Sequence, residues 1–154
     1  MKFEIGRPDG DQRRYRRPYV AVWVEDKDGV AVRTLSLWVQ TQAPGPRWHP
    51  DLKKWYQNDQ VRRLVDDKDL VATVARPTRP PGQYEVIWDG KDDHGQPVET
   101  GEYTVHIEAA REHGTYQVIR KPLTIASTPF AEELKGNVEI KSAAVAYRRK
   151  GGKK

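Results

Sequence analysis

The sequence predicts an all-β fold, an antiparallel β-sandwich of about seven strands with one short helical insertion. Short runs rich in Val, Ile, Tyr and Trp recur along the chain, and apolar residues alternate in them as they do in strands. Turn-forming Gly, Asp, Asn and Pro residues separate the runs. A single segment, at about residues 50–66, changes to the helical period. Short strands at this spacing favour two packed sheets with Greek-key connections.

The composition fits one folded domain. The 154 residues include five Trp and seven Tyr, residue types in which disordered chains are poor. The absence of cysteine excludes disulfides, thiolate zinc sites and thiol nucleophiles. No run reaches the roughly 18 apolar residues that would predict a transmembrane segment, and no signal-peptide pattern opens the chain. No serine lies in a nucleophile motif, so the sequence does not support hydrolase chemistry.

The formal net charge of +5 comes from the two ends of the chain. Residues 1–17 carry six basic and three acidic residues, and residues 148–154 carry five basic and no acidic residues. We therefore expect flexible basic segments at 1–17 and 148–154 around a domain at 18–147. Because the basic residues do not predict a folded face interleaved with aromatics, we expect no nucleic-acid binding.

The first two strands are predicted at 19–25 and 30–39, where Asp28 and Gly29 suit a tight hairpin. Both faces of the first strand are apolar, as a central strand requires. One face carries Val20, Val22 and Val24, and the other carries Tyr19, Ala21 and Trp23. Further strands are predicted at 70–75, 84–88, 103–109, 116–126 and 137–147, with a proline-rich connection at 76–82.

The helical insertion begins near Pro50, a residue suited to a first helical position. Leu52, Trp55 and Tyr56 then follow at i, i+3 and i+4. We expect this insertion to fold across a sheet face bearing Trp23 and Trp38, as a second core layer. Alternatively, its exposed rim docks a partner protein or an anionic ligand. The candidate partner-binding residues are Arg47, Trp48, His49, Lys53, Lys54, Trp55 and Tyr56.

The stretch VIWDGKDDHGQPVETGEYTVHI, residues 86–107, raises the question of a cation loop. The EF-hand spacing fails, because Lys91 and His94 stand where a ligand and a glycine are required. A calcium site of another geometry, using Asp89, Asp92 and Asp93, remains an alternative. We interpret the stretch as a long hairpin connection held by side-chain-to-backbone hydrogen bonds. Its structural turn residues are Trp88, Asp89, Gly90, Asp92, Gly95 and Gly101.

Part of this stretch, WDGKDDHGQPVETGEYTVHI, resembles the signature W-D-G-x-D-x-x-G-x-x-V-x-x-G-x-Y-x-V of the immunoglobulin-like domain in flagellar hook-capping proteins. The resemblance implies an immunoglobulin-like β-sandwich. Together with RRPYVAVWVEDKDG, RWHPDLKKWY and GNVEIKSAAVAY, the stretch also resembles a family of small bacterial periplasmic proteins of unknown function. This second likeness spans about residues 17–147.

The second resemblance implies an exported protein and a periplasmic location. Members of that family occur near or fused to PepSY-type membrane proteins, which are thought to reduce flavin or iron. The resemblance therefore implies a non-catalytic accessory or interaction domain, whose partner is a PepSY-type membrane protein or another periplasmic protein. Because the chain lacks the signal peptide of such exported members, we expect that it starts after cleavage or was cut from a larger membrane-anchored protein.

Three alternatives follow from particular residues. In the family, the segment before R-P-P-G often resembles a motif whose last Thr is esterified to FMN; here Val74 and Thr78 match, but Arg76 and Pro77 replace small residues. No cofactor is therefore expected, and a flavin on Thr78 is the alternative. A metal carrier using His106, Glu108 and His113 is another, although we expect these side chains to be solvated. A carbohydrate-binding sandwich using the tryptophans is the third function considered.

Overall fold

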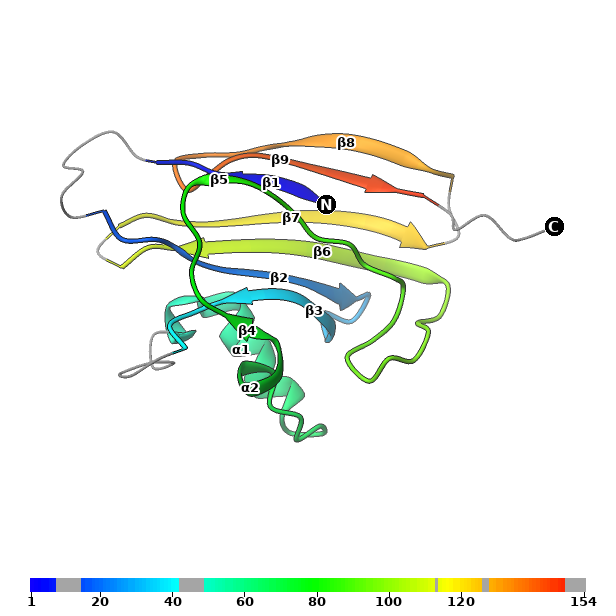
Figure 1. Cartoon of the computed structure of the whole chain (residues 1–154). Coiled ribbons are helices and arrows are strands. Elements are labelled where there is room, and N and C mark those ends of the chain that lie inside the picture. Colours follow the sequence, from blue (N-terminus) through cyan, green and yellow to red (C-terminus); the bar gives the residue numbers. More distant parts are fainter. Residues whose placement is uncertain (8–14, 42–48, 113, 126–127, 149–154) are drawn as a thin grey trace.

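The computed structural model describes residues 1–7, 15–41, 49–112, 114–125 and 128–148 and forms two packed β-sheets (Figure 1). This confirms the predicted β-sandwich. Sheet A has the strand order β5-β1-β9-β8, and sheet B has the order β4-β3-β2-β6-β7. Neighbouring strands are antiparallel except β3 and β4, which are parallel.

Each sheet combines strands from distant parts of the chain. The strands of sheet A are β1 (Lys2–Ile5), β5 (Gly82–Glu85), β8 (Phe130–Lys135) and β9 (Ile140–Tyr147). The strands of sheet B are β2 (Tyr19–Asp26), β3 (Ala31–Trp38), β4 (Ala75–Arg76), β6 (Gly101–Ala110) and β7 (Tyr116–Ile125). The helical elements are the 3-10 helix η2 (His49–Asp51), α1 (Lys53–Arg62) and α2 (Leu70–Val74). They form a layer beside β3 and β4 (Figure 1).

Sheet B is covered on both faces, which gives the molecule two apolar cores. Alternate residues of β2 enter different cores, as its sequence predicted. The core between the sheets contains Phe3, Ile5, Val20, Val22, Val24, Val105, Ile107 and Ile140. The core between sheet B and the helices contains Tyr19, Ala21, Trp23, Leu37, Leu52, Trp55 and Leu70. The helical insertion thus packs as a second core layer.

Two expected element boundaries are wrong. The segment 1–17 is not flexible throughout, because Lys2–Ile5 form β1. Phe3 and Ile5 alternate with polar residues and are only 2% and 1% exposed, so this strand contributes apolar area to the core. Residues 70–74 form helix α2 instead of a strand. The Asp69 side chain accepts a hydrogen bond from the Ala72 amide at 2.9 Å and caps this helix.

Trp38 lies on the other face of β3 from the one expected. The pairing of β2 with β3 shifts between Val22, opposite Ser36, and Trp23, opposite Thr34. This irregularity places one extra residue in β3 and reverses the alternation beyond it. Trp38 therefore packs between the two sheets, whereas Trp23 lies under the helices.

The stretch between β5 and β6 is a crossover between sheets and not the predicted hairpin. β5 pairs with β1 in sheet A, whereas β6 pairs with β2 and β7 in sheet B. The predicted side-chain-to-backbone bonds are confirmed. Asp92 Oδ1 accepts from the amides of His94 at 2.9 Å and Gln96 at 2.8 Å. Gly95 supplies a positive φ of 78° within this turn.

Candidate functional site

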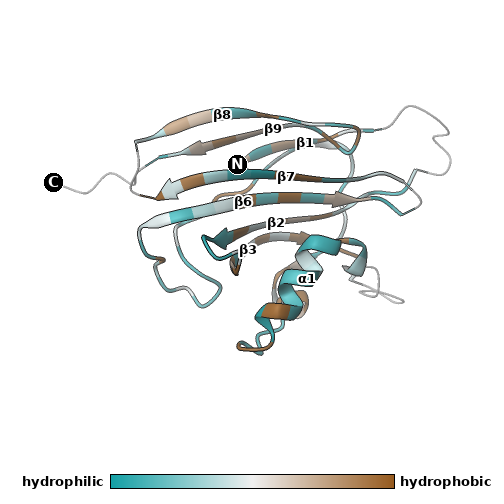
Figure 2. Ribbon diagram, turned by 180° about the vertical axis from the view of Figure 1, so that it is seen from behind, coloured by the Kyte–Doolittle hydropathy of each residue, from teal (hydrophilic) through white to brown (hydrophobic). Residues whose placement is uncertain are grey.

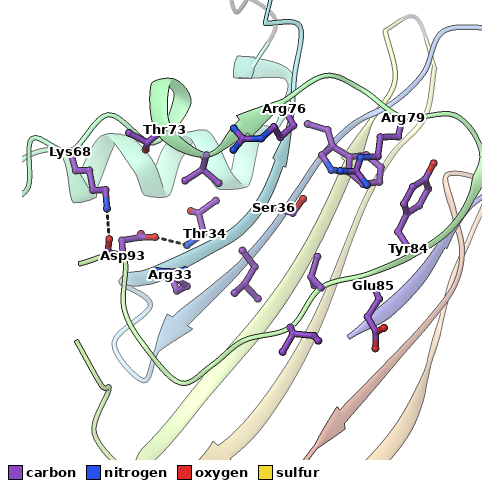
Figure 3. Close-up of a pocket in the computed structure, with 15 residues that line it drawn as sticks. Arg33, Thr34, Ser36, Lys68, Thr73, Arg76, Arg79, Tyr84, Glu85 and Asp93 are labelled. Atoms are coloured by element: carbon purple, nitrogen blue, oxygen red, sulfur yellow. Dashed lines mark hydrogen bonds between the residues drawn. The ribbon is translucent and has the colours of Figure 1, made fainter. Parts of the chain in front are cut away.

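A groove of about 520 Å³ opens at the side of the sandwich, along β3 (Figure 3). Its floor is β3, one wall is formed by α2 and β4, and the opposite wall by residues 84–87, the first two of which belong to β5 of sheet A. The groove exists because the partner of β3 on this side is short. β4 pairs with β3 only at Leu37 and Trp38, after which the chain crosses to sheet A.

Positive charge predominates along this groove. Four basic and two acidic residues line it: Arg33, Lys68, Arg76 and Arg79, with Glu85 and Asp93. The guanidinium of Arg79 lies 5.2 Å from the ring centroid of Trp38 and 5.6 Å from that of Tyr84. These cation–π contacts hold the charge over the floor at one end of the groove. The groove is therefore suited to an anion.

Asp93 occupies the opposite end of the groove and is only 7% exposed. Its Oδ1 accepts a hydrogen bond from the Thr34 amide at 3.1 Å, and its own amide donates to the Val32 carbonyl at 2.9 Å. Lys68 Nζ donates to the Asp93 carbonyl oxygen (Figure 3). The other carboxyl oxygen, Oδ2, is buried and has no hydrogen-bond partner among the described residues. Burial raises the pKa of Asp93, although the Thr34 amide and nearby cations oppose this effect.

A second unpartnered polar atom lies at the same end of the groove. Arg33 Nη1 donates to the Asp92 carbonyl at 2.6 Å, but Arg33 Nε is buried and, within the described part of the chain, donates to no group. The two atoms have complementary roles, since Nε is a donor and an ionised Asp93 Oδ2 is an acceptor. This site was not predicted from the sequence, because Asp93 meets β3 only after the crossover brings the two together.

Of the predicted metal ligands, His106 and Glu108 share one face of β6, but they are not solvated as expected. Glu108 is 0% exposed and His106 is 2% exposed, because the helical layer covers this face. Glu108 accepts hydrogen bonds from the amides of Lys54 at 2.8 Å and Trp55 at 2.7 Å, at the start of α1. It also accepts from the Tyr116 hydroxyl at 2.6 Å. Burial, together with this bond, raises the pKa of Tyr116.

His106 belongs to a second buried polar contact. Its ring stacks on Trp23 at 4.7 Å between centroids, and its Nε2 lies 3.0 Å from Glu25 Oε2. Glu25 Oε1 accepts from Trp23 Nε1 at 2.9 Å and from the Asn58 side chain of α1. Burial would raise the pKa of Glu25, but the close contact with His106 and the hydrogen bond from Trp23 outweigh it and lower that pKa. These groups join sheet B to α1.

Two of the three predicted metal ligands, His106 and Glu108, lie among the described residues. Among the described residues no three His, Asp or Glu side chains are grouped as a metal site. His113, the third predicted ligand, lies outside the described residues. The described residues of the alternative calcium set are likewise not grouped as a metal site. Asp92 and Asp93 each accept hydrogen bonds from backbone amides instead.

The predicted docking residues have different positions. Arg47 and Trp48 lie outside the described residues, and the side chain of His49 is likewise not described. Trp55 is 1% exposed and donates from Nε1 to Thr34 Oγ1 at 3.1 Å, so it is a core residue. Lys53 is exposed and lies over the Tyr116 ring at 5.7 Å. Lys54 and Tyr56 are half-buried.

Three of the four described tryptophans offer little surface for stacking on sugars, and the fourth, Trp88, is half-buried. Trp23, Trp38 and Trp55 are 0–2% exposed. A sugar ring requires an accessible aromatic face, so carbohydrate binding through Trp23, Trp38 and Trp55 is excluded.

Thr78, the alternative flavin acceptor, is half-buried beside a second cavity of about 450 Å³. Its carbonyl accepts from Arg17 Nη1 at 3.4 Å.

The end of α1 carries an exposed apolar tip, which we define as Val61, Leu64 and Val65. Their exposures are 54%, 83% and 87%, and Figure 2 shows hydrophobic colour returning toward this end of an otherwise hydrophilic helix. Buried Arg62 holds the tip in place. Its guanidinium donates to Asp59 Oδ1 at 2.7 Å and to the Lys68 carbonyl at 2.6 Å.

Comparison with known proteins identifies the family of this chain. A family model described as "Predicted periplasmic protein (DUF2271)" matches residues 1–142. No curated protein matches the chain. Within the described residues, none of the helices has the length and apolar character needed to cross a membrane. The chain therefore belongs to the DUF2271 family and is a periplasmic protein with a β-sandwich fold.

Proposed function

We propose that this protein is a non-catalytic periplasmic interaction module, an accessory domain of a PepSY-type membrane redox protein. The observation that carries the proposal is the apolar tip at the end of α1. Its three aliphatic side chains are mostly exposed to water. Exposed apolar groups gathered on one projecting segment are typical of surfaces that bind another protein.

The apolar tip is not required for the packing of α1. The helical layer is attached to sheet B by Leu52, Trp55 and Leu70, all at most 1% exposed. Glu108 binds the first turn of α1 at the opposite end of the helix. Since these contacts hold the helix without the tip, burial of Leu64 and Val65 requires a second molecule.

The surroundings of the apolar tip favour a partner protein over a purely lipidic surface. Arg63, whose side chain is 42% exposed, lies within 4 Å of both Asp59 and Asp69. Exposed Arg63 and Asp69 thus place opposite charges beside the apolar tip, as polar rims do around the apolar centres of protein interfaces. The choice of a PepSY-type partner rests on the family resemblance described above. The cofactor-carrier alternative keeps Thr78 as its candidate residue.

The proposal is tested by co-purification from the native host in mild detergent. The double variant Leu64→Ser, Val65→Ser should reduce recovery of the PepSY-type protein by about tenfold or more, because apolar contacts are lost. Lys53→Glu examines the rim suggested by the sequence and should have a smaller effect. Val138→Ser changes a 47% exposed valine near β9 and serves as the matched control.

Thermal unfolding distinguishes lost binding from lost folding. The double variant should keep the melting temperature of the wild-type protein, because its side chains are exposed in the free chain. If recovery of the membrane protein is unchanged while the fold is intact, the apolar tip is not the docking surface and the proposal fails. Loss of recovery in Val138→Ser as well would also contradict it.

A further inference from the structure

We propose that the groove along β3 binds a short acidic peptide, with a backbone amide at the Asp93 end and a carboxylate at the Arg79 end. This surface is separate from the apolar tip, and the inference does not depend on the proposed function. It is carried by three features: unpartnered buried polar atoms, an excess of cations and a cavity of ligand size.

The first feature is the unpartnered oxygen of Asp93. A side chain that is 7% exposed has lost most of its contact with water. Oδ1 regains a partner in the Thr34 amide, but Oδ2 has none among the described residues. A buried acceptor without a donor is unfavourable for folding and calls for an explanation. Because Asp93 lines the groove, a small rotation of its carboxyl group would bring Oδ2 to a donor from a ligand there and complete its hydrogen bonding.

The second unpartnered atom restricts the chemistry of that ligand. Arg33 Nε is a buried donor at the same end of the groove, and it too lacks a partner in the described part of the chain. A peptide bond offers both complements, since its carbonyl accepts from Nε and an N–H donates to Asp93. A simple carboxylate or phosphate matches only Arg33 and would be repelled by ionised Asp93. An amide therefore fits this end better than a simple anion does.

The opposite end of the groove is suited to the carboxylate. Arg79 rests over Trp38 and Tyr84, and no carboxylate of the described residues pairs with its guanidinium. Arg76 donates from Nη1 to the Ala75 carbonyl, which leaves its other donors available. Figure 3 shows both arginines on the rim at this end, with Tyr84 beside Arg79. Guanidinium groups bind carboxylates through paired hydrogen bonds, which gives both affinity and orientation.

The size and walls of the groove fit a few residues of extended chain. A volume of about 520 Å³ lies within the range of about 300–1,000 Å³ typical of small-ligand sites. Val74 on one wall and Val86 on the other provide apolar surface between the two polar ends. Because cations are distributed along the groove, acidic peptides should bind better than neutral ones.

Isothermal titration calorimetry with defined peptides tests the proposal. The main probe is acetyl-Ala-Ala-Glu-Ala-amide, and acetyl-Ala-Ala-Ala-Ala with a free carboxyl end distinguishes a terminal from a side-chain carboxylate. Acetyl-Ala-Ala-Gln-Ala-amide is the neutral control and should bind at least about tenfold more weakly. Sodium acetate provides the carboxylate without the amide and should also bind at least about tenfold more weakly.

Variants at the two ends of the groove should weaken binding independently. Asp93→Asn keeps an acceptor for the Thr34 amide and removes the charged acceptor, so the dissociation constant should rise about tenfold. The double variant Arg76→Gln, Arg79→Gln should cause a similar loss through the other end. Lys91→Gln removes an exposed charge from the same crossover, away from the groove lining, and should stay within about twofold of wild type.

Three results would overturn the proposal. One is absence of binding by either acidic peptide up to about 5 mM. Another is equal binding of the neutral peptide or of acetate, which would make the groove a general apolar or anion surface. The third is wild-type affinity in both groove variants. Because Arg76 and Arg79 are exposed, their variant should fold even if Asp93→Asn does not.

Discussion

Two buried carboxyl groups, Glu108 under the helices and Asp93 at the groove, differ in how completely they are hydrogen-bonded. Both oxygens of Glu108 accept hydrogen bonds, from two amides of α1 and from Tyr116. Asp93 has a donor for one oxygen only. A fully bonded buried carboxylate holds elements together, whereas one with an unpartnered oxygen beside a groove is available to a ligand. The same residue chemistry thus serves structure in one place and binding in the other.

The largest effect is expected from Glu108→Ala. The change leaves two amides at the start of α1 and the Tyr116 hydroxyl without their acceptor, which should lower the free energy of unfolding by about 3 kcal/mol. Chemical denaturation measures this loss. Tyr116→Phe removes one of the three bonds and should cost about 1 kcal/mol. Equal stability of Glu108→Ala and wild type would show that the helix is held without this carboxylate.

An intermediate effect is expected from Glu25→Gln. The pKa of Glu25 is lowered in the folded protein, so its ionised form stabilises the fold above the usual Glu pKa, and this stabilisation is lost as the pH falls through the lowered pKa. The variant should lose about 1 kcal/mol at pH 7 and show a weaker decline in acid. Denaturation at a series of pH values checks both. An unchanged acid decline would mean that other carboxyls cause it.

The smallest effect on stability is expected from Asp93→Asn, and its pH dependence has the opposite sign. The pKa of Asp93 is raised, so the folded protein holds this proton more tightly than the unfolded chain does. Its contribution to stability is present below the usual Asp pKa and falls as the pH rises through the raised pKa. The variant should therefore stay within about 1 kcal/mol of wild type at pH 7 and lose this part of the pH dependence. A large loss of stability would assign Asp93 to the same structural class as Glu108.

Local patterns predicted the elements whose surroundings are set by neighbouring residues. Alternation in β2 identified both of its buried faces, and the i, i+3, i+4 pattern of Leu52 and Trp55 identified the helical insertion. The turn bonds of Asp92 were predictable because they span only a few residues. The cap at Asp69 was also a visible signal for α2, but the apolar run after it was interpreted as a strand.

Features that depend on distant segments could not be predicted in this way. Alternation placed His106 and Glu108 on one face of β6, yet it could not indicate that the helical layer covers that face. Asp93 became a groove residue because it contacts Thr34, far away in the sequence. A shift in the β2–β3 pairing changed the face of Trp38 without any glycine or proline to mark it. Each of these depends on tertiary contacts.

The placement of β1 beside β9 bears on the order of folding. Lys2 pairs with Ala144 and with Glu85, so sheet A joins three separate parts of the chain. The β2–β3 and β6–β7 hairpins of sheet B are joined by short turns, and closing them costs much less chain entropy. We therefore expect sheet B to assemble first, with Val22 and Ile107 exposed to water until β1 and β9 arrive. The rate of reaching the native state, and the time spent open to aggregation, should depend on how quickly these two distant strands meet.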